Sequence, residues 1–246
     1  MPLAMHKYLT VLPLAICLAL PAFAADKKKN EEGITREQAD EILNELRQIR
    51  ELLEKGAGSA AADGTGIHMN LEDGPWLGSK DAPMTMVEFT DYQCGFCRQF
   101  HLATFPELKK KYIDTGKLRF ASRDLPLDFH SNAARAAQAA RCAGDQQEFW
   151  QMRDRLITNA DKLSPADLNR YAQALKLDPL QFQTCMDSGK YAKTVQKDVT
   201  TAEGFGVTGT PSFLLGKSTR DGVSGVILVG AVPLDAFEAR FKELAQ

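Results

Sequence analysis

The stretch VEFTDYQCGFCRQF, residues 87–100, constrains the fold of this chain most strongly. It closes a β-rich run, PMTMVEFT (83–90), and places Cys94 and Cys97 at the start of a helix-compatible segment, 96–116. A second β-rich run, KLRFASRDLPL (117–127), follows that segment. β-rich runs on both sides of a helical pattern predict a βαβ unit whose helix begins at the two cysteines.

The position of the two cysteines predicts redox chemistry. A cysteine at a helix start meets unpaired backbone N–H groups and the positive end of the helix dipole, and both stabilise a thiolate. Cys94 is therefore the candidate nucleophile, because a thiolate attacks substrate disulfides. Cys97, one helical turn later, is the candidate thiol that resolves the mixed disulfide.

A C-x-x-C pair is also half of a zinc site, which needs two more ligands. The other cysteines lie far along the chain without C-x-x-C or H-x-x-x-H partners, and we interpret His101 and His130 as ordinary helix or loop residues. A strand followed at once by C-x-x-C at a helix start favours the redox interpretation, so we expect no metal and no cofactor.

Glu88 lies six residues before Cys94 in the same strand, between Val87 and Phe89. These apolar neighbours indicate a strand buried on both faces, which would put the acid beneath the C-x-x-C. Burial would raise the pKa of Glu88, and the carboxyl could then relay the proton of Cys97 while the mixed disulfide resolves. The alternative is an exposed glutamate on an edge strand.

The first 24 residues have the pattern of a secretory signal peptide, with an apolar run and a cleavage motif at Ala22-Phe23-Ala24. A membrane anchor is the weaker alternative, because Pro13 and Pro21 interrupt a short run. Cleavage would remove Cys17, one of the five cysteines, and place the mature chain in the periplasm. The compartment is oxidising, so disulfides can persist there.

Four remaining cysteines allow three pairings, and the local C-x-x-C favours 94–97 together with Cys142–Cys185. We expect the second bridge to be a structural disulfide. It would close a long loop within a helical region, and neither cysteine has an activating context. The alternative is a second redox pair.

The rest of the chain divides into segments of different pattern. A polar tail (25–34) precedes an amphipathic helix (35–55) that opens with a capping-box signature at Thr35 and Gln38. Its apolar residues follow a heptad seam, and together with a flexible linker (56–66) they indicate an oligomerisation helix. That seam consists of Ala39, Ile42, Leu46, Ile49 and Leu53. The alternative is a helix docked on its own domain.

Beyond the linker, the pattern indicates a β-containing domain (67–129 and 204–246) that is split by a helical insertion (130–203). Within the insertion, helix starts are expected at Ser131, Ser164-Pro165 and Asp178-Pro179. The second part of the domain contains the runs PSFLLG and SGVILVG, joined by the loop KSTRDGV, and a helix from Pro233.

These motifs resemble the DsbA-type branch of the thioredoxin superfamily. The resemblance rests on VEFTDYQCGFC, RDLPL, the helical insertion and GVTGTPSF, and it covers about residues 75–246. It implies an α/β thioredoxin fold with an inserted helical domain and an acid at the place of Glu88. It also implies a cis-proline loop, Thr210-Pro211, that faces the active site and contributes to substrate binding together with Gly95 and Phe96.

Two features differ from the DsbA oxidases and resemble the DsbC-type isomerases. The central dipeptide is Gly95-Phe96 in place of Pro-His, and Thr210 precedes the proline in place of valine. Without a histidine between the cysteines, Cys94 loses one source of thiolate stabilisation, so we expect a weaker oxidant. The N-terminal helix also resembles the oligomerisation elements of DsbC and of the ScsC-like suppressors of copper sensitivity.

The sequence therefore predicts an enzyme, a periplasmic protein disulfide oxidoreductase and isomerase. Its partners would be unfolded or misfolded secreted proteins, a membrane redox partner of DsbB or DsbD type, and further copies of itself in a dimer or trimer. Nucleic acid is excluded as a partner, because the formal charge is −2 and no basic stripe is present. Two alternatives stay open: a reductase or copper-tolerance protein kept reduced by a DsbD-type donor, and a holdase-like chaperone.

Overall fold

A computed structural model describes residues 35–59, 66–71 and 74–244 of the chain. The expected signal peptide (1–24), the polar tail (25–34) and residues 60–65 of the expected linker lie outside the described residues. The chain divides into two units, of which the first contains most of helix α1 (Arg36–Ser59) and the second contains everything downstream. In the part of the chain that the structure describes, no helix combines the length and apolarity that a membrane span requires.

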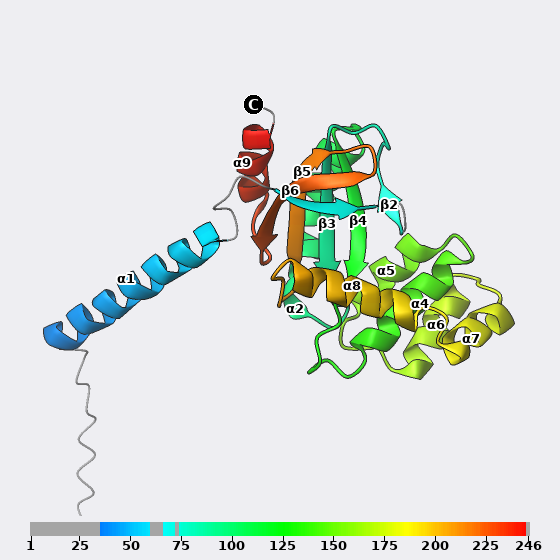
Figure 1. The fold of residues 1–246 in the computed structure, drawn as a ribbon. Helices are drawn as coiled ribbons and strands as arrows, with labels where there is room; N and C mark the ends of the chain where they lie inside the picture. Colours follow the sequence, from blue (N-terminus) through cyan, green and yellow to red (C-terminus); the bar gives the residue numbers. More distant parts are fainter. Residues whose placement is uncertain (1–34, 60–65, 72–73, 245–246) are drawn as a thin grey trace, which may run out of the picture. The chain divides into compact units, whose positions relative to one another are not determined.

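The second unit is built on a six-stranded sheet with the order β1-β6-β5-β3-β4-β2 (Figure 1). β3 and β4 run parallel, as the βαβ prediction requires, and all other neighbouring pairs are antiparallel. The strands are β1 (Ile67–Asn70), β2 (Trp76–Leu77), β3 (Met84–Thr90), β4 (Leu118–Asp124), β5 (Ser212–Ser218) and β6 (Gly222–Val229).

The sequence did not predict β1 and β2, and it predicted too long a loop between β5 and β6. In the structure these two strands pair up to Ser218 and Val223, so most of the expected loop KSTRDGV is strand. A glycine makes the pairing of β6 with β1 possible, because a Cβ atom at Gly222 would lie 1.8 Å from the carbonyl oxygen of Met69. Because glycine is uncommon inside strands, the sequence around Gly222 was predicted to be loop although it is strand.

One continuous helical run connects β3 to β4. It consists of α2 (Gly95–Gln99), η1 (Phe100–Thr104), α3 (Phe105–Leu108) and η2 (Lys109–Ile113), of which η1 and η2 are π-helical turns. Pro106 lies within the run and lacks the backbone N–H that a regular helix would use. The widened turns accommodate this missing donor.

Five helices form the insertion, and Figure 1 shows most of them beyond the carboxyl ends of β3 and β4, while α8 crosses in front of the sheet. Ser164 forms a capping box with Asp167, and the Asp178 side chain caps the next helix, as the sequence indicated. The first helix starts at Ala133 after Asn132 instead of at Ser131. The insertion helices are α4 (Ala133–Gly144), α5 (Phe149–Thr158), α6 (Pro165–Ala174), α7 (Pro179–Ser188) and α8 (Ala192–Gly204), and α9 (Leu234–Leu244) closes the chain.

Alternation along β3 divides its side chains between two cores. Met86 packs in the aromatic core that also contains Phe100, Phe213 and Phe237, on the face covered by the helical run and α9. Val87 and Phe89 pack in the opposite core, where α8 contributes Ala202 and its neighbours. Because side chains two apart share a face, Glu88 points to the same side as Met86, toward the helical run.

Buried charges join the insertion to the sheet. Arg141 of α4 donates hydrogen bonds to Asp124 at the end of β4 and to Asp198 of α8, and all three side chains are less than 10% exposed. Asp198 also accepts a hydrogen bond from the backbone N–H of Asp124, at 3.1 Å. Three elements therefore meet at one ion cluster, which we name the Arg141 cluster.

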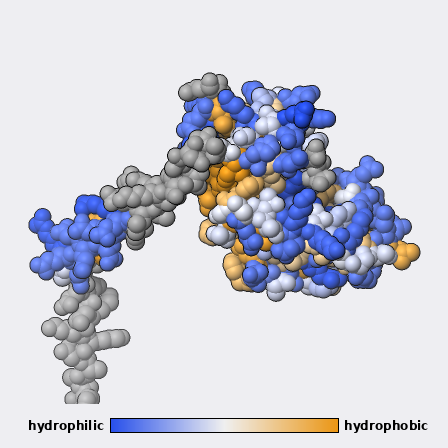
Figure 2. Space-filling model, in the orientation of Figure 1, coloured by the Kyte–Doolittle hydropathy of each residue, from blue (hydrophilic) through white to orange (hydrophobic). Residues whose placement is uncertain are grey.

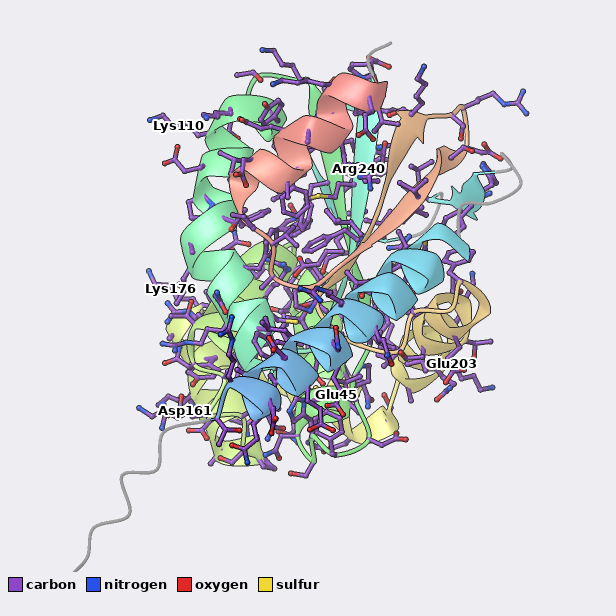
Figure 3. All side chains as sticks on the ribbon, turned by 90° about the vertical axis from the view of Figure 1, so that its left-hand side faces the viewer. Glu45, Lys110, Asp161, Lys176, Glu203 and Arg240 are labelled. Atoms are coloured by element: carbon purple, nitrogen blue, oxygen red, sulfur yellow. A yellow bond between two sulfur atoms is a disulfide. The ribbon has the colours of Figure 1, made fainter. Side chains whose placement is uncertain are left out.

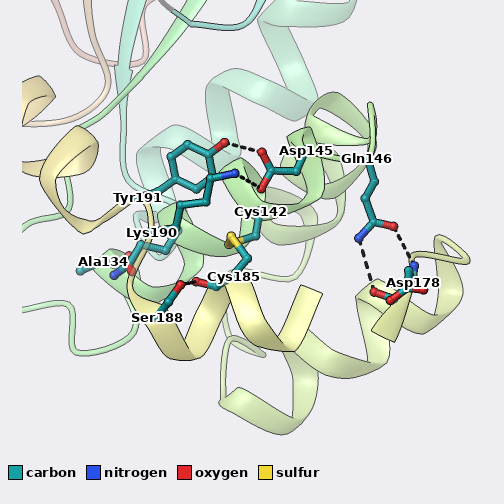
Figure 4. Close-up of a disulfide and its surroundings, with 10 residues drawn as sticks. Ala134, Cys142, Asp145, Gln146, Asp178, Cys185, Ser188, Lys190 and Tyr191 are labelled. Atoms are coloured by element: carbon teal, nitrogen blue, oxygen red, sulfur yellow. Dashed lines mark hydrogen bonds and ion pairs between the residues drawn. A yellow bond between two sulfur atoms is a disulfide. The ribbon is translucent and has the colours of Figure 1, made fainter. Parts of the chain in front are cut away.

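A disulfide joins two helices of the insertion (Figure 4). Cys142 of α4 and Cys185 of α7 are bonded, both are buried, and the bridge spans a sequence separation of 43 residues. The ends of these helices carry further polar contacts, since Asp145 accepts hydrogen bonds from Lys190 and Tyr191. The outer surface of the second unit is charged, and Figure 3 labels exposed examples: Lys110, Asp161, Lys176, Glu203 and Arg240.

α1 is capped at its start and apolar along one side. Thr35 and Gln38 exchange the two hydrogen bonds of a capping box, at 3.0 and 3.2 Å. Ile42, Leu43 and Leu46 are 46%, 48% and 55% exposed. The helix continues to Ser59, four residues into the segment 56–66 that we expected to be linker. The sequence GAGS contains no proline, and small residues can extend a helix at a penalty of about 1 kcal/mol per glycine.

Candidate active site

The two cysteines lie where β3 ends and the helical run begins. Cys94 is the residue that precedes α2, and its backbone carbonyl accepts a hydrogen bond from the N–H of Arg98 at 3.1 Å. The turn before it is closed by a bond from the Cys94 N–H to the carbonyl of Asp91. Both thiols are free, with Cys94 6% exposed and Cys97 fully buried. Cys94 is thus the more accessible sulfur, although most of its surface is covered.

The surroundings of Cys94 stabilise its thiolate. A hydrogen bond from the thiol of Cys97 lowers the pKa of Cys94 to about 5, with further help from the backbone N–H groups of Cys97 and Phe96, although partial burial opposes the shift. The Cys97 thiol, with help from the helix start, therefore lowers this pKa even though no histidine separates the two cysteines. The Cys94 Sγ atom also lies 3.4 Å from the carbonyl oxygen of Thr210.

Cys97 has the opposite chemistry. Burial raises its pKa well above the usual value of a thiol, and the sulfur of Cys94 and the charge of Glu88 act in the same direction. The backbone N–H of Asp91 points at the Cys97 Sγ atom, at 3.5 Å. Cys97 is thus a protonated thiol at neutral pH, and it needs a base before it can attack a disulfide.

Thr210-Pro211 is a cis peptide bond at the start of β5. The backbone N–H of Gly230 donates to the carbonyl of Pro211 at 2.8 Å, which ties the cis segment to the end of β6. Since the Thr210 carbonyl lies beside Cys94, this segment and the C-x-x-C are adjacent.

Glu88 is completely buried and forms an ion pair that the sequence did not predict. Its Oε2 atom accepts a hydrogen bond from Arg153 of α5, and its Oε1 atom has no hydrogen-bond partner among the described residues. Burial raises the pKa of Glu88, while the positive charge of Arg153 and the nearby hydroxyl of Thr90 oppose that rise. The charge of Glu88 raises the pKa of Cys97, so the two groups interact.

Sequence reasoning missed Arg153, although one signal was present. In the helix FWQMRDRLIT, the buried residues Phe149, Met152 and Leu156 define an apolar stripe, and Arg153 falls on it four residues after Phe149. An arginine on a buried stripe requires a partner charge. The sequence does not reveal which acid provides it.

A second buried acid, Asp91, organises the turn before the cysteines. Its carboxylate accepts hydrogen bonds from the backbone N–H groups of Gln93 and Leu127, at 2.7 and 2.8 Å, and its Oδ2 atom lies 2.8 Å from Nδ1 of His130. His130 was expected to be an ordinary loop residue, and in fact it ties the loop after β4 to the active-site turn. Within the described ranges, no group of His, Cys, Asp and Glu side chains could hold a metal ion.

Several elements that meet near the active site carry exposed apolar side chains. Phe96, between them, is 66% exposed, and Val229, which pairs with Ser212 beside the cis bond, is 65% exposed. Leu102 of the helical run and Phe129 of the loop after β4 are 50% and 78% exposed. Figure 2 shows hydrophobic surface near β6 and near α2.

Comparison with known proteins places this geometry in a family. The sequence model of the family described as Thioredoxin matches residues 70–225, more than half of the chain. The crystal structure of Wolbachia pipientis alpha-DsbA1 is similar, with a TM-score of 0.63 and 26% identity over 72% of this chain and 92% of that one.

Two relatives by sequence differ in length from this chain. The Bacillus subtilis protein named disulfide bond formation protein D is 29% identical, over 58% of this chain and 68% of that protein. A Salinispora tropica protein named Na(+)/H(+) antiporter NhaA 3 is 35% identical over 161 residues, which are 65% of this chain. The chain spans about a quarter of the length of that antiporter, 24%.

Proposed function

The chain belongs to the thioredoxin family, in its DsbA-type branch, and we propose that it is a periplasmic thiol–disulfide oxidoreductase that forms and isomerises disulfides in secreted proteins. One observation carries the proposal. Two free cysteines at one helix start have opposite pKa shifts, with Cys94 a thiolate near neutral pH and Cys97 a buried thiol. This asymmetry supports a role in attack for Cys94 and a role in resolution for Cys97.

The proposed reaction uses three side chains. The Cys94 thiolate attacks a client disulfide, and the resulting mixed disulfide joins Cys94 to the client. Glu88 then accepts the proton of Cys97, and the Cys97 thiolate attacks Cys94 to release the client with its disulfide reduced. The reverse sequence, from the oxidised Cys94–Cys97 pair, forms a client disulfide. Isomerisation results when another client thiol attacks the mixed disulfide instead of Cys97. The Oε1 atom of Glu88 supports this role, because it is buried without a hydrogen-bond partner and carries a lone pair for the proton.

The client would bind along the exposed apolar surface beside the cysteines. We assign client contacts to Gly95 and Phe96 and to the cis segment Thr210-Pro211. Two features support the assignment: the 66% exposure of Phe96, and the Thr210 carbonyl 3.4 Å from the Cys94 sulfur. An unfolded or misfolded protein exposes the apolar side chains that such a surface can take up.

We further propose that α1 assembles the chain into a dimer or trimer. Ile42, Leu43 and Leu46 are exposed and make one side of the helix apolar. Because apolar residues in a heptad pattern pack against another helix of the same pattern, we propose that a second copy of α1 covers this side. An assembly would present several C-x-x-C sites to one client, which favours repeated exchange and therefore isomerisation.

The proposed activity is tested with a client whose disulfides have been scrambled. The wild-type protein in a glutathione buffer should restore the activity of a scrambled ribonuclease, and Cys94→Ser should not. A Cys94→Ser, Cys97→Ser variant that restores the client as well as the wild type would contradict the proposal and favour a holdase.

The direction of the reaction in cells depends on the membrane partner. Trapping the thiols in cells with an alkylating agent distinguishes two partner types. An oxidised Cys94–Cys97 pair indicates a DsbB-type oxidase as partner, and a reduced pair indicates a DsbD-type donor. The oxidised pair is the form that would make disulfides in a client, whereas isomerisation starts from the Cys94 thiolate of the reduced pair.

A further inference from the structure

The buried carboxylate of Glu88 obtains its counter-charge from outside the β-sheet. Its partners on the two neighbouring strands are Ser122 of β4 and Phe213 of β5, and neither is charged. The guanidinium that pairs with it belongs to Arg153, on α5 of the helical insertion. Arg153 is 1% exposed, so both members of the pair are removed from water.

The guanidinium of Arg153 is held by three polar partners. Besides its bond to Glu88, Nε donates to the Ser122 hydroxyl at 3.3 Å, and Nη1 lies 3.4 Å from Nδ1 of His101. Nε2 of His101 lies 2.8 Å from Asp154, whose side chain is 66% exposed. Burial lowers the pKa of His101. The ring is then neutral, and it donates to Asp154 and accepts from Arg153.

Aromatic rings complete the site of Arg153. The centroids of Phe105, Phe120 and Trp150 lie 5.5, 5.5 and 5.7 Å from its Cζ atom. Ring faces stabilise a cation without water. The site therefore suits a planar cation in one orientation, with Nη2 directed at Oε2 of Glu88.

The same helix also contacts the C-x-x-C helix directly. Arg98, which follows Cys97, donates a hydrogen bond from Nε to the backbone carbonyl of Thr158 at the end of α5, at 3.1 Å. The contact at Arg98 and the ion pair at Arg153 thus fix α5 against the active site at two points.

We propose that Arg153 is a positioning residue for the redox reaction, holding Glu88 as a carboxylate whose Oε1 atom can accept the proton of Cys97. The inference deepens the proposed function, because it rests on the role given to Glu88. A fully buried carboxyl without a partner charge stays protonated, and a protonated carboxyl cannot accept a second proton. The insertion would therefore supply part of the active site.

The step that depends on Arg153 is the release of the client. The S–H bond of Cys97 breaks, and its proton passes to Oε1 of Glu88. The Cys97 sulfur forms a bond with the Cys94 sulfur while the bond between Cys94 and the client sulfur breaks. The client sulfur leaves with the electron pair and takes a proton from water. The two enzyme thiols are thereby oxidised to a disulfide, and the client cysteine is reduced.

Few other ionisable groups face Glu88. Cys97 of α2 and Arg153 of α5 interact with Glu88, and Tyr92, just after β3, also lies within its electrostatic reach. His101 and Asp154 interact with Arg153 and not with Glu88 directly. Burial raises the pKa of Tyr92, so that it stays neutral. The pH dependence of release should therefore report the coupled titration of Glu88 and Cys97.

The test measures how fast Cys97 releases glutathione from a mixed disulfide on Cys94, by stopped flow from pH 4 to 9. Arg153→Gln should shift the midpoint of the profile to higher pH by about one unit and slow release at neutral pH about tenfold. Arg153→Lys retains a cation, so it should restore most of the rate. Arg155→Gln, on the same helix, is the matched control and should behave as the wild type.

A folded Arg153→Gln variant with the wild-type profile would overturn the inference. If Gln at this position prevents folding, Arg153→Lys provides the decision. The pH profile of release by Arg153→Lys should shift to higher pH, by less than one unit. In a protein that already carries Glu88→Gln, adding Arg153→Lys should not change the release rate further. An equal effect of Arg153→Lys in both backgrounds would mean that Arg153 does not act through Glu88. A wild-type protein that releases no glutathione would overturn the proposed function itself.

Discussion

At the scale of single residues, the chemistry depends on an asymmetry between two cysteines separated by one helical turn. Cys94 ends the active-site turn and receives hydrogen bonds from Cys97 and from the helix start, whereas Cys97 is enclosed by protein. The same covalent group thus has a low pKa at one position and a high pKa at the other. Desolvation and hydrogen bonding account for the difference.

The first prediction concerns the titration of Cys94. In the reduced protein, the rate of alkylation of Cys94 should rise as the pH rises through about 5, because its thiolate form is the reactive one. The Cys97 thiol is the leading cause of the low pKa, so Cys97→Ala should move the midpoint to higher pH. Cys97→Ser retains a hydroxyl donor and should move it less.

Mass spectrometry of alkylated peptides follows this titration residue by residue. Two results would contradict these roles: preferential labelling of Cys97 in the wild type, or a Cys94 midpoint in the Cys97→Ala variant equal to that of the wild type. The first result would exchange the roles of the two sulfurs. The second would assign the shift to the backbone N–H groups alone.

At the scale of elements, helices far apart in the sequence meet at buried charges. Arg141 of α4 lies between Asp124 of β4 and Asp198 of α8, and all three side chains are less than 10% exposed. An ion pair of this kind contributes little when both partners are present, yet removing one partner leaves buried charge without compensation. The Arg141 cluster therefore makes docking of the insertion sensitive to a single substitution.

The second prediction is that Arg141→Met destabilises the protein by about 3–5 kcal/mol, because Asp124 would lose the cation that it shares with Asp198, and Asp198 would retain, among the described residues, only Arg123, at 3.6 Å. Urea unfolding at neutral pH gives the free energy of unfolding. Arg135→Met is the matched control, since Arg135 is exposed on the same helix and should change the free energy by less than about 0.5 kcal/mol. Equal effects of the two substitutions would contradict the importance of the cluster.

The third prediction concerns the disulfide between α4 and α7. Replacing Cys142 and Cys185 by serine should lower the free energy of unfolding by roughly 4 kcal/mol, since the bridge closes a long loop in the unfolded chain. The alkylation profile of Cys94 should not change, because we assign the bridge a structural role. A changed profile would indicate a second redox pair.

The elements around the cysteines could be predicted from the sequence, because their signals are local. The alternation in β3, the position of the C-x-x-C and the apolar neighbours of Glu88 all lie within about fifteen residues of one another. Arg153 could not be assigned to Glu88, because the pair is 65 residues apart and depends on how the insertion docks. β1 escaped prediction because it is four residues long and pairs through glycine.

At the scale of the whole molecule, the two units have different roles in the proposed function. The second unit carries the redox site, and its insertion contributes Arg153 to that site. α1 carries exposed apolar residues and no residue of the proposed chemistry. Assembly and catalysis should therefore be separable by deletion.

The fourth prediction follows from this division. Deleting residues up to Gly66 should give a folded monomer that oxidises dithiols at least as fast as the full-length mature protein and isomerises scrambled clients less well. Loss of the α1 seam removes the local concentration of sites around one client. Light scattering and the two activity assays check the prediction. A monomeric full-length protein at micromolar concentration would contradict the role of α1.

The central claim is that Cys94 forms the mixed disulfide and Cys97 resolves it, and one measurement tests it most directly. A Cys97→Ser variant is mixed with a scrambled client, quenched with acid and analysed by mass spectrometry of its disulfide-linked peptides. We expect an adduct in which the client is linked to Cys94, and we expect the wild type to release the client from the same adduct. The matched Cys94→Ser variant is analysed in the same way. If its client is linked to Cys97, and the Cys97→Ser variant has no adduct on Cys94, the assigned roles of the two cysteines are wrong.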